Sequence, residues 1–186
     1  MKVLLTSAGL ETDTIKNFFL EILAKKPQEI KALFIPTAAI DVGAIGVLPK
    51  CINDLLKCGF KEENITVYDL HKVMLLEKLK QFDVVYICGG NTAYLLERIN
   101  EQGFNVVLKD YIENNGIVVG VSAGSIIMAQ NLENNLGLIN CILNVHCICG
   151  NKAGHLNLLN CQEISLTNNQ AIYLTDIDCA SIIEEL

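Results

Sequence analysis

The feature that most constrains the fold is a series of short, almost wholly apolar runs separated by segments with helical periodicity. Runs such as 2–9, 30–38 and 83–90 have the length of single strands and end in small residues. The segments between them place apolar side chains three or four positions apart, which is typical of amphipathic helices. Strands without a polar face are buried on both faces. The pattern therefore predicts an α/β fold, with a mainly parallel sheet and helices on both of its faces.

The same patterns give an order of elements. We expect strands over 2–9, 30–38, 64–70, 83–90 and 117–121, and helices over 11–27, 46–60, 73–81, 92–103, 104–114 and from about 123. Strand-like pieces then follow over 137–149, 162–167 and 171–175, which predicts a C-terminal β-hairpin or edge strands. Glu184 and Glu185 are expected to end a solvated helix. Because no linker or repeat divides the chain, we expect one domain over residues 1–186.

Composition excludes several classes of function. Hydrophobic residues make up 51% of the chain and charged residues 19%, which argues against disorder. Residues 99–186 hold two Lys or Arg against nine Asp or Glu, and Arg98 is the only arginine. This acidic balance disfavours nucleic-acid and anionic-membrane partners. The apolar start of the chain is too short for a signal peptide, and no apolar run approaches the length of a membrane span. We therefore expect a cytoplasmic protein.

The chain has eight cysteines, which lie at positions 51, 58, 88, 141, 147, 149, 161 and 179. In a cytoplasmic chain they are expected as free thiols. The segment 141–161 is rich in Cys and His but contains no C-x2-C pair. Structural zinc sites favour that wider spacing. We expect neither a metal nor an organic cofactor.

The stretch "GIVVGVSAGSIIMA", residues 116–129, contains a G-x-S-x-G pattern where a strand is expected to meet a helix. One interpretation is that Gly120 and Gly124 only allow the strand and helix to pack closely. The other is that the sharp turn exposes Ser122 as a nucleophile. In that case the N–H of Ala123, at the helix start, is placed to stabilise an oxyanion.

The stretch "CGGNT" ends the preceding strand at the same expected sheet edge. Gly90 is our candidate for a second oxyanion donor, with Asn91 shaping the loop and contacting substrate. The alternative is a glycine turn with Asn91 or Thr92 as the N-cap of the next helix. The two interpretations are compatible.

A nucleophilic serine needs a base, and the chain has three histidines. His71 is expected to be exposed, and His155 lies in a polar loop. His146 follows the serine at the end of an expected strand and is the best candidate, although an ordinary half-buried histidine would look the same. A third residue must accept the other imidazole N–H. Glu133, between Ser122 and His146, is one possibility.

Four motifs occur in order over most of the chain: "CGGNTAYLL", "GVSAGSI", "NVHC" and "LTNNQAIYL". Together they resemble the dipeptidase E-like serine peptidase family, which includes cyanophycinase and has a flavodoxin-like fold similar to class I glutamine amidotransferases. The resemblance implies Ser122 as nucleophile, His146 as base, and Gly90 and Ala123 as oxyanion donors. It also implies a serine hydrolase that cleaves short peptides through an acyl-enzyme.

The chain departs from this family at one position. The family often has an acidic residue in the segment matching "LTNNQ", where this chain has Asn168. An amide accepts from imidazole but carries no charge, and the corresponding Asp→Asn change in a serine-protease triad lowers turnover about 10⁴-fold. Either Glu133 substitutes, or the site is slow, or the chain is an inactive binding or regulatory domain of the glutamine amidotransferase-like fold. A preference for N-terminal aspartate would need a cation, for which Lys152 and His155 are candidates.

Overall fold

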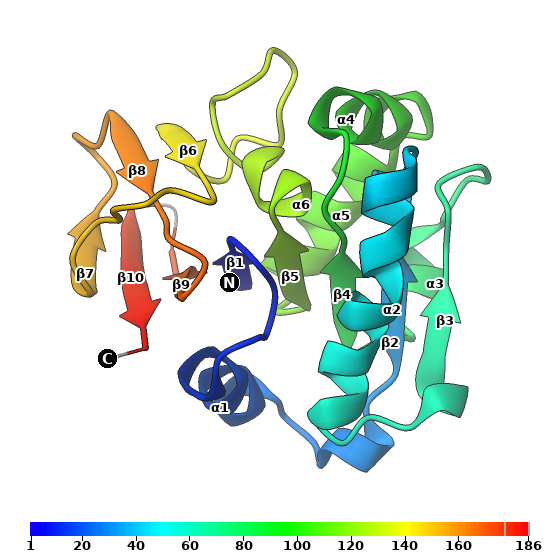
Figure 1. The fold of residues 1–186 in the computed structure, drawn as a ribbon. Helices are drawn as coiled ribbons and strands as arrows, with labels where there is room; N and C mark the ends of the chain where they lie inside the picture. Colours follow the sequence, from blue (N-terminus) through cyan, green and yellow to red (C-terminus); the bar gives the residue numbers. More distant parts are fainter. Residues whose placement is uncertain (177, 186) are drawn as a thin grey trace.

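The computed structural model describes residues 1–176 and 178–185. Within these residues the main sheet has eight strands in the order β3-β2-β4-β5-β1-β9-β10-β7 (Figure 1). The parallel part consists of β1 (Lys2–Thr6), β2 (Ala32–Ile35), β3 (Ile65–Val67), β4 (Val84–Ile87) and β5 (Ile117–Val121). The antiparallel part consists of β7 (Gly154–Asn157), β9 (Gln170–Leu174) and β10 (Cys179–Glu184). A small separate sheet pairs β6 (Ile142–Asn144) with β8 (Glu163–Ser165).

Helices cover both faces of the main sheet, which confirms the predicted fold class. Figure 1 shows α1 (Asp13–Ile22) and α2 (Val42–Lys57) in front of the sheet, with α3 (Leu76–Leu79) and α5 (Phe104–Glu113) behind it. The remaining helices are α4 (Thr92–Glu101) and α6 (Ala123–Ile126), with short 3-10 turns η1 (Pro27–Glu29) and η2 (Glu62–Asn64). Leu4 of β1 belongs to the core cluster under α1 and α2, whereas Val3 and Leu5 belong to the cluster on the opposite face. This alternation is what a strand buried on both faces requires.

Local capping accounts for helix boundaries that differ from the predicted ones. The Asp41 side chain accepts a hydrogen bond from the Ala44 N–H at 2.9 Å, so α2 begins at Val42 rather than at 46. The helix predicted over 11–27 is also shorter than expected. Helix α1 ends at Ile22, before the Lys-Lys-Pro sequence, and Pro27 begins η1. The expected helix from 123 is only the four residues of α6.

The C-terminal region forms the predicted hairpin, because β9 pairs antiparallel with both β1 and β10. The prediction of a helix that ends at Glu184 and Glu185 is wrong, since Glu184 is the last residue of β10. Ala180 and Ile182 are buried at a spacing of two, as in a strand. The loop expected around His155 is also wrong, because this residue lies in β7. No helix among the described residues is both long and apolar enough to cross a membrane.

Candidate active site

Four of the predicted site residues gather where the carboxyl ends of β1, β4 and β5 meet, namely Gly90, Ser122, His146 and Asn168. The strand register places Thr6 beside Val121 and Ile87 beside Gly120, so the segments that follow these strands leave the sheet together. A cavity of about 380 Å³ opens there. It is lined by Ser7, Ala8, Glu11, Gly43, Ala44, Val47, Leu48, Lys50, Cys51, Asp54, Gly89, Gly90, Val121, Ser122, His146 and Asn168. Ligands of open α/β sheets bind at this edge.

Ser122 occupies the sharp turn between β5 and α6. Its backbone has φ 49° and ψ −108°, a conformation that L-residues rarely adopt and that costs about 1–3 kcal/mol. Contacts with the end of β1 hold it there: the Ser122 N–H donates to the Thr6 carbonyl at 3.0 Å, and the buried Ser125 hydroxyl donates to the same oxygen at 2.8 Å. The turn is therefore fixed by the sheet, and Ser122 lines the cavity.

The two glycines around Ser122 are required by close packing. A Cβ on Gly120 would lie 2.6 Å from the Gly124 carbonyl oxygen, and a Cβ on Gly124 would lie 2.3 Å from the Ile87 carbonyl oxygen. The packing interpretation of the glycines is thus correct. It does not compete with a chemical role for Ser122, because the same packing presents this side chain to the cavity.

His146 reaches Ser122 from the C-terminal part of the chain. Its Nε2 lies 3.0 Å from Ser122 Oγ. The strand predicted over 137–149 is only β6, so His146 lies in the segment after a strand and not within one. Its backbone is left-handed, with φ 58°. The His146 N–H donates to Ser7 Oγ at 2.7 Å, which ties this segment to the end of β1.

Asn168, and not Glu133, contacts the imidazole. Asn168 Oδ1 lies 2.7 Å from His146 Nδ1. When Nδ1 carries the proton, it donates to this oxygen and leaves Nε2 free to accept from the Ser122 hydroxyl. Glu133 is exposed in the loop after α6 and is not among the residues that line the cavity.

The loop after β4 passes directly beside Ser122. A Cβ on Gly89 would lie 3.1 Å from Ser122 Cβ. Gly90 has φ 137°, and a Cβ there would lie 2.1 Å from the Ala38 carbonyl oxygen. Among the described residues, the N–H groups of Gly90 and Ala123 have no hydrogen-bond partner. Gly90 lines the cavity, whereas Ala123 is buried and is not among the lining residues.

Asn91 caps the helix that follows this loop. Its side chain accepts a hydrogen bond from the Tyr94 N–H at 2.9 Å at the start of α4, and its own N–H donates to the Ala38 carbonyl at 2.7 Å. The N-cap interpretation is correct. Asn91 is not among the residues that line the cavity, so its contribution is to fix the position of Gly90.

Sequence reasoning missed Ser7 and the charged residues of the cavity. Lys50 of α2 donates a hydrogen bond to Glu11, and this contact raises the pKa of Lys50. Burial raises the pKa of Asp54, whose carboxylate accepts from the Leu10 N–H at 3.0 Å. Ser7 and Glu11 could have been suspected as polar residues just after the first strand, whereas Lys50 and Asp54 carry no comparable signal.

The cation candidates named from the sequence lie elsewhere. Lys152 and His155 are not among the residues that line the cavity, and His155 Nδ1 lies 3.3 Å from Ser181 Oγ on β10. His71 is exposed, as predicted. All eight cysteines are within the described residues and are free thiols, four of them buried. In the described part of the chain, no group of three or more His, Cys, Asp or Glu side chains could hold a metal ion.

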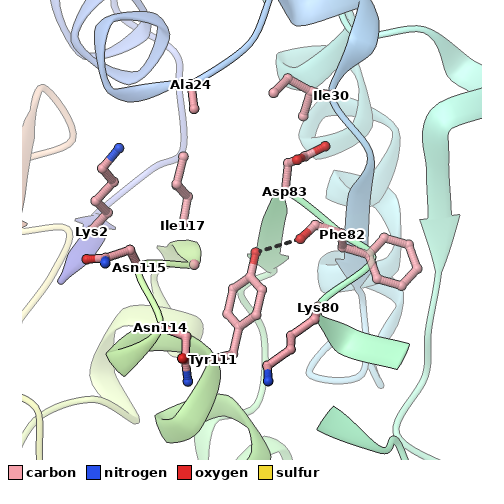
Figure 2. Close-up of a pocket in the computed structure, with 11 residues that line it drawn as sticks. Lys2, Ala24, Ile30, Lys80, Phe82, Asp83, Tyr111, Asn114, Asn115 and Ile117 are labelled. Atoms are coloured by element: carbon pink, nitrogen blue, oxygen red, sulfur yellow. Dashed lines mark hydrogen bonds between the residues drawn. The ribbon is translucent and has the colours of Figure 1, made fainter. Parts of the chain in front are cut away.

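A second cavity, of about 220 Å³, lies at the opposite end of the parallel strands. It is lined by Lys2 at the start of β1 and Ile117 at the start of β5. Figure 2 shows the Tyr111 hydroxyl donating across it to the Phe82 carbonyl, at 3.1 Å. None of the predicted site residues lines this cavity. The candidate site is therefore the one at the carboxyl ends of the strands.

Comparison with known proteins places this α/β chain in a peptidase family. The model of peptidase family S51 matches residues 3–143, and the chain belongs to this family. The match contains Gly90, Ser122 and Ala123 and ends before His146 and Asn168. The resemblance to the dipeptidase E family noted from the motifs is confirmed.

Curated relatives are themselves uncharacterized peptidases. The chain is 26% identical over 100 residues to PM1590 of Pasteurella multocida, which is 54% of this chain and 48% of that protein. It is 26% identical over 101 residues to YgaJ of Bacillus subtilis, which is 54% of this chain and 43% of that protein. The chain thus aligns with about half the length of these relatives.

Solved structures support the fold over the whole chain. A candidate peptidase E from Listeria monocytogenes EGD-e has a TM-score of 0.76 at 20% identity, covering 100% of this chain and 98% of that one. A peptidase from an acI-B1 Actinobacterium has a TM-score of 0.67 at 13% identity, covering 99% and 87%. At these identities the similarity shows a shared fold.

Proposed function

We propose that this chain is a serine-type peptidase that hydrolyses short peptides through an acyl-enzyme on Ser122. The observation that carries the proposal is the 3.0 Å contact between Ser122 Oγ and His146 Nε2 at a strained strand–helix turn. Membership of peptidase family S51 supports the peptidase class. Serine is a weak nucleophile on its own and becomes effective when a base in contact with it accepts its proton.

In the proposed acylation step, Ser122 Oγ attacks the peptide carbonyl carbon and its proton passes to His146 Nε2. Asn168 Oδ1 accepts from Nδ1–H throughout and keeps the imidazole oriented. The carbonyl oxygen becomes an oxyanion that the N–H groups of Gly90 and Ala123 stabilise, and each such donor contributes on the order of 3 kcal/mol. When the intermediate collapses, the C–N bond breaks and the imidazolium gives its proton to the leaving amine.

Deacylation repeats the same steps with water. His146 takes a proton from a water molecule, whose oxygen attacks the ester carbonyl of acylated Ser122. The C–O bond to Ser122 breaks, the peptide acid leaves, and Ser122 Oγ recovers its proton from Nε2. The proton transfers of both steps run between Ser122 and His146, whose side chains are already in contact.

The size of the cavity favours short peptides. Its volume of about 380 Å³ lies at the low end of the range for small-molecule sites. The Glu11–Lys50 pair brings both charges to its lining, and the Lys50 side chain is 55% exposed. A small zwitterionic substrate, with a free amine and a free carboxylate, matches this combination of size and charge.

A fluorophosphonate probe tests the proposal, because it phosphonylates only serines that are activated as nucleophiles. We expect labelling of the wild type, no labelling of Ser122→Ala and reduced labelling of His146→Ala. Ser181→Ala is the matched control, since it removes a hydroxyl on β10 that does not line the cavity, and it should leave labelling intact. A dipeptide library assay then identifies the substrate.

The opposite result is equally informative. A folded wild-type protein that takes up no probe after prolonged exposure would contradict the proposal. That outcome would favour the alternative, a binding or regulatory domain in which Asn168 marks a lost catalytic relay.

A further inference from the structure

The Asn168 amide can present either its oxygen or its NH2 group to His146, whereas a carboxylate presents an oxygen in both orientations. Rotating the amide by half a turn exchanges its oxygen and its NH2 group at nearly the same positions. With the oxygen toward His146, Nδ1 keeps its proton and Nε2 accepts from Ser122. With the NH2 toward His146, Nδ1 becomes the acceptor and Nε2 carries the proton. The second state cannot take a proton from Ser122.

Ser7 is placed to select between these two states. It follows β1 and is fully buried. Its Oγ accepts from the His146 N–H at 2.7 Å and donates to Asn168 Oδ1 at 3.2 Å. One hydroxyl thus contacts the backbone of the proposed base and the side chain that orients it.

The Ser7 hydroxyl proton needs the amide oxygen. If Asn168 were rotated, its NH2 group would face Ser7 Oγ, and the Ser7 hydroxyl proton would lose the amide oxygen as its acceptor. Among the described residues, the remaining acceptor near Ser7 Oγ is His146 Nδ1, which lies at the longer distance of 3.5 Å. A buried hydroxyl without a good acceptor is unfavourable, so the rotated state is disfavoured.

We propose that Ser7 is a positioning residue that holds the Asn168 amide oxygen toward His146 and thereby fixes the imidazole tautomer that can accept from Ser122. The inference rests on the proposed function for its effect on turnover. Its effect on the tautomer is independent of activity. It also explains how an asparagine can stand where the family often has an acid.

The sharpest test compares Ser7→Ala in two backgrounds. In the wild-type background we expect Ser7→Ala to lower kcat/KM about tenfold, since both amide orientations become accessible. In the Asn168→Asp background the loss should be no more than about threefold, because both ends of a carboxylate accept hydrogen bonds. KM should change little in either background, since Ser7 acts through His146.

Ser125→Ala is the matched control for this comparison. Its hydroxyl is equally buried and donates to the Thr6 carbonyl, with no contact to residue 168. Its cost should be the same in both backgrounds. If Ser7→Ala does not fold, Ser7→Cys fills the site with a much weaker donor and carries the same comparison.

Nitrogen-15 NMR of the His146 ring reads the tautomer directly. We expect neutral His146 to carry its proton on Nδ1 in the wild type, and a population with the proton on Nε2 to appear in Ser7→Ala. Asn168→Asp should restore the Nδ1 form.

Two outcomes would overturn the inference. One is an equal loss of kcat/KM from Ser7→Ala in both backgrounds, and the other is an unchanged tautomer in Ser7→Ala. A wild type that the fluorophosphonate probe does not label would instead contradict the proposed function, and the NMR measurement would still test Ser7.

Discussion

The proposed catalytic groups come from two regions of different character. Ser122 and the Gly90 loop follow adjacent parallel strands whose register fixes their separation. His146 and Asn168 lie in irregular segments around the small β6–β8 sheet and the β8–β9 connection. The family match over residues 3–143 covers the first region and ends before the second. The proposed nucleophile is therefore positioned by the sheet, whereas the proposed base is held near it by contacts with Ser7 and Asn168.

Ser7 is where these two regions meet. It directly follows β1 of the parallel part, and its hydroxyl forms hydrogen bonds with His146 and Asn168. The edge of the parallel sheet presents Ser122, whereas His146 and Asn168 come from a C-terminal extension, which comprises β6 to β10 and the segments between them. Substitutions in the parallel part should therefore cause the larger losses of activity or stability. Substitutions in the extension should cause smaller changes, which can be gains as well as losses.

The largest effect is expected from Gly90→Ala in the parallel part. A Cβ there would lie 2.1 Å from the Ala38 carbonyl oxygen, at a φ of 137° that side chains rarely tolerate. The loop must move and its N–H leaves the oxyanion position, so kcat should fall about 10²–10³-fold. Steady-state kinetics on the best dipeptide measures this.

Gly103→Ala is the control for Gly90→Ala. Gly103 also has a positive φ, of 64°, but nothing lies within 4 Å of an added Cβ. We expect it to lower the free energy of unfolding by about 1 kcal/mol without changing kcat. Full activity in Gly90→Ala would exclude Gly90 as an oxyanion donor.

Thr6→Val tests how firmly the end of β1 holds the Ser122 turn. The Thr6 hydroxyl donates to the Gly120 carbonyl at 3.0 Å and accepts from the Gly9 N–H at 3.0 Å, and both bonds are buried. Losing them should lower the free energy of unfolding by about 2 kcal/mol. Urea denaturation measures this, with Thr66→Val on exposed β3 expected within about 0.5 kcal/mol of wild type. Equal effects at the two positions would contradict a special role for the end of β1.

In the C-terminal extension, Asn168→Asp tests the residue that contacts the His146 imidazole. A carboxylate in place of the amide would stabilise the imidazolium, so turnover should rise about tenfold or more. The neighbouring Asn169→Asp adds the same charge without the contact to His146 and is the control. If Asn168→Asp changes nothing and Glu133→Gln causes a large loss, the third catalytic role belongs to Glu133.

The smallest effect concerns Asp54, on the α2 side of the cavity. Burial raises the pKa of Asp54 above its ordinary 3.8, so the protonated form is favoured in the folded state. Because the folded state binds this proton more tightly than the unfolded chain, protonation of Asp54 stabilises the folded state. This contribution to the free energy of unfolding is fully present below pH 3.8 and is lost as the pH rises through the raised pKa. Asp54→Asn should flatten this decrease in the free energy of unfolding. Urea denaturation at a series of pH values measures the slope, and an unchanged slope in the variant would contradict the assignment.

The parallel part was readily predictable from the sequence. Apolar runs that must be buried on both faces have few alternatives to strands, and the strand predicted over 117–121 is β5 itself. The G-x-S-x-G turn and the Gly-Gly-Asn loop are local patterns with local causes, so Ser122, Ala123 and Gly90 could be named.

The extension was less predictable because its elements depend on tertiary pairing. β6 and β8 are three residues each, and β7 carries mostly exposed side chains, so none has a strong periodicity. His146 could be selected as a base from its place after the serine, whereas Asn168 could be named only through the resemblance of its flanking motif. Ser7 could not be identified as a partner, since it is separated from His146 by 139 positions and its role depends on their contact in space.

Both Ser122 and His146 have a positive φ, which glycine would adopt without strain. Unfavourable backbone conformations therefore occur at the two residues that are proposed to exchange a proton. Laboratory evolution of this chain for heat resistance alone would favour glycine at both positions. The resulting protein would be more stable and would lack the proposed peptidase activity. Selection for the proposed hydrolysis would keep Ser122 and His146, whereas selection for stability alone would replace both.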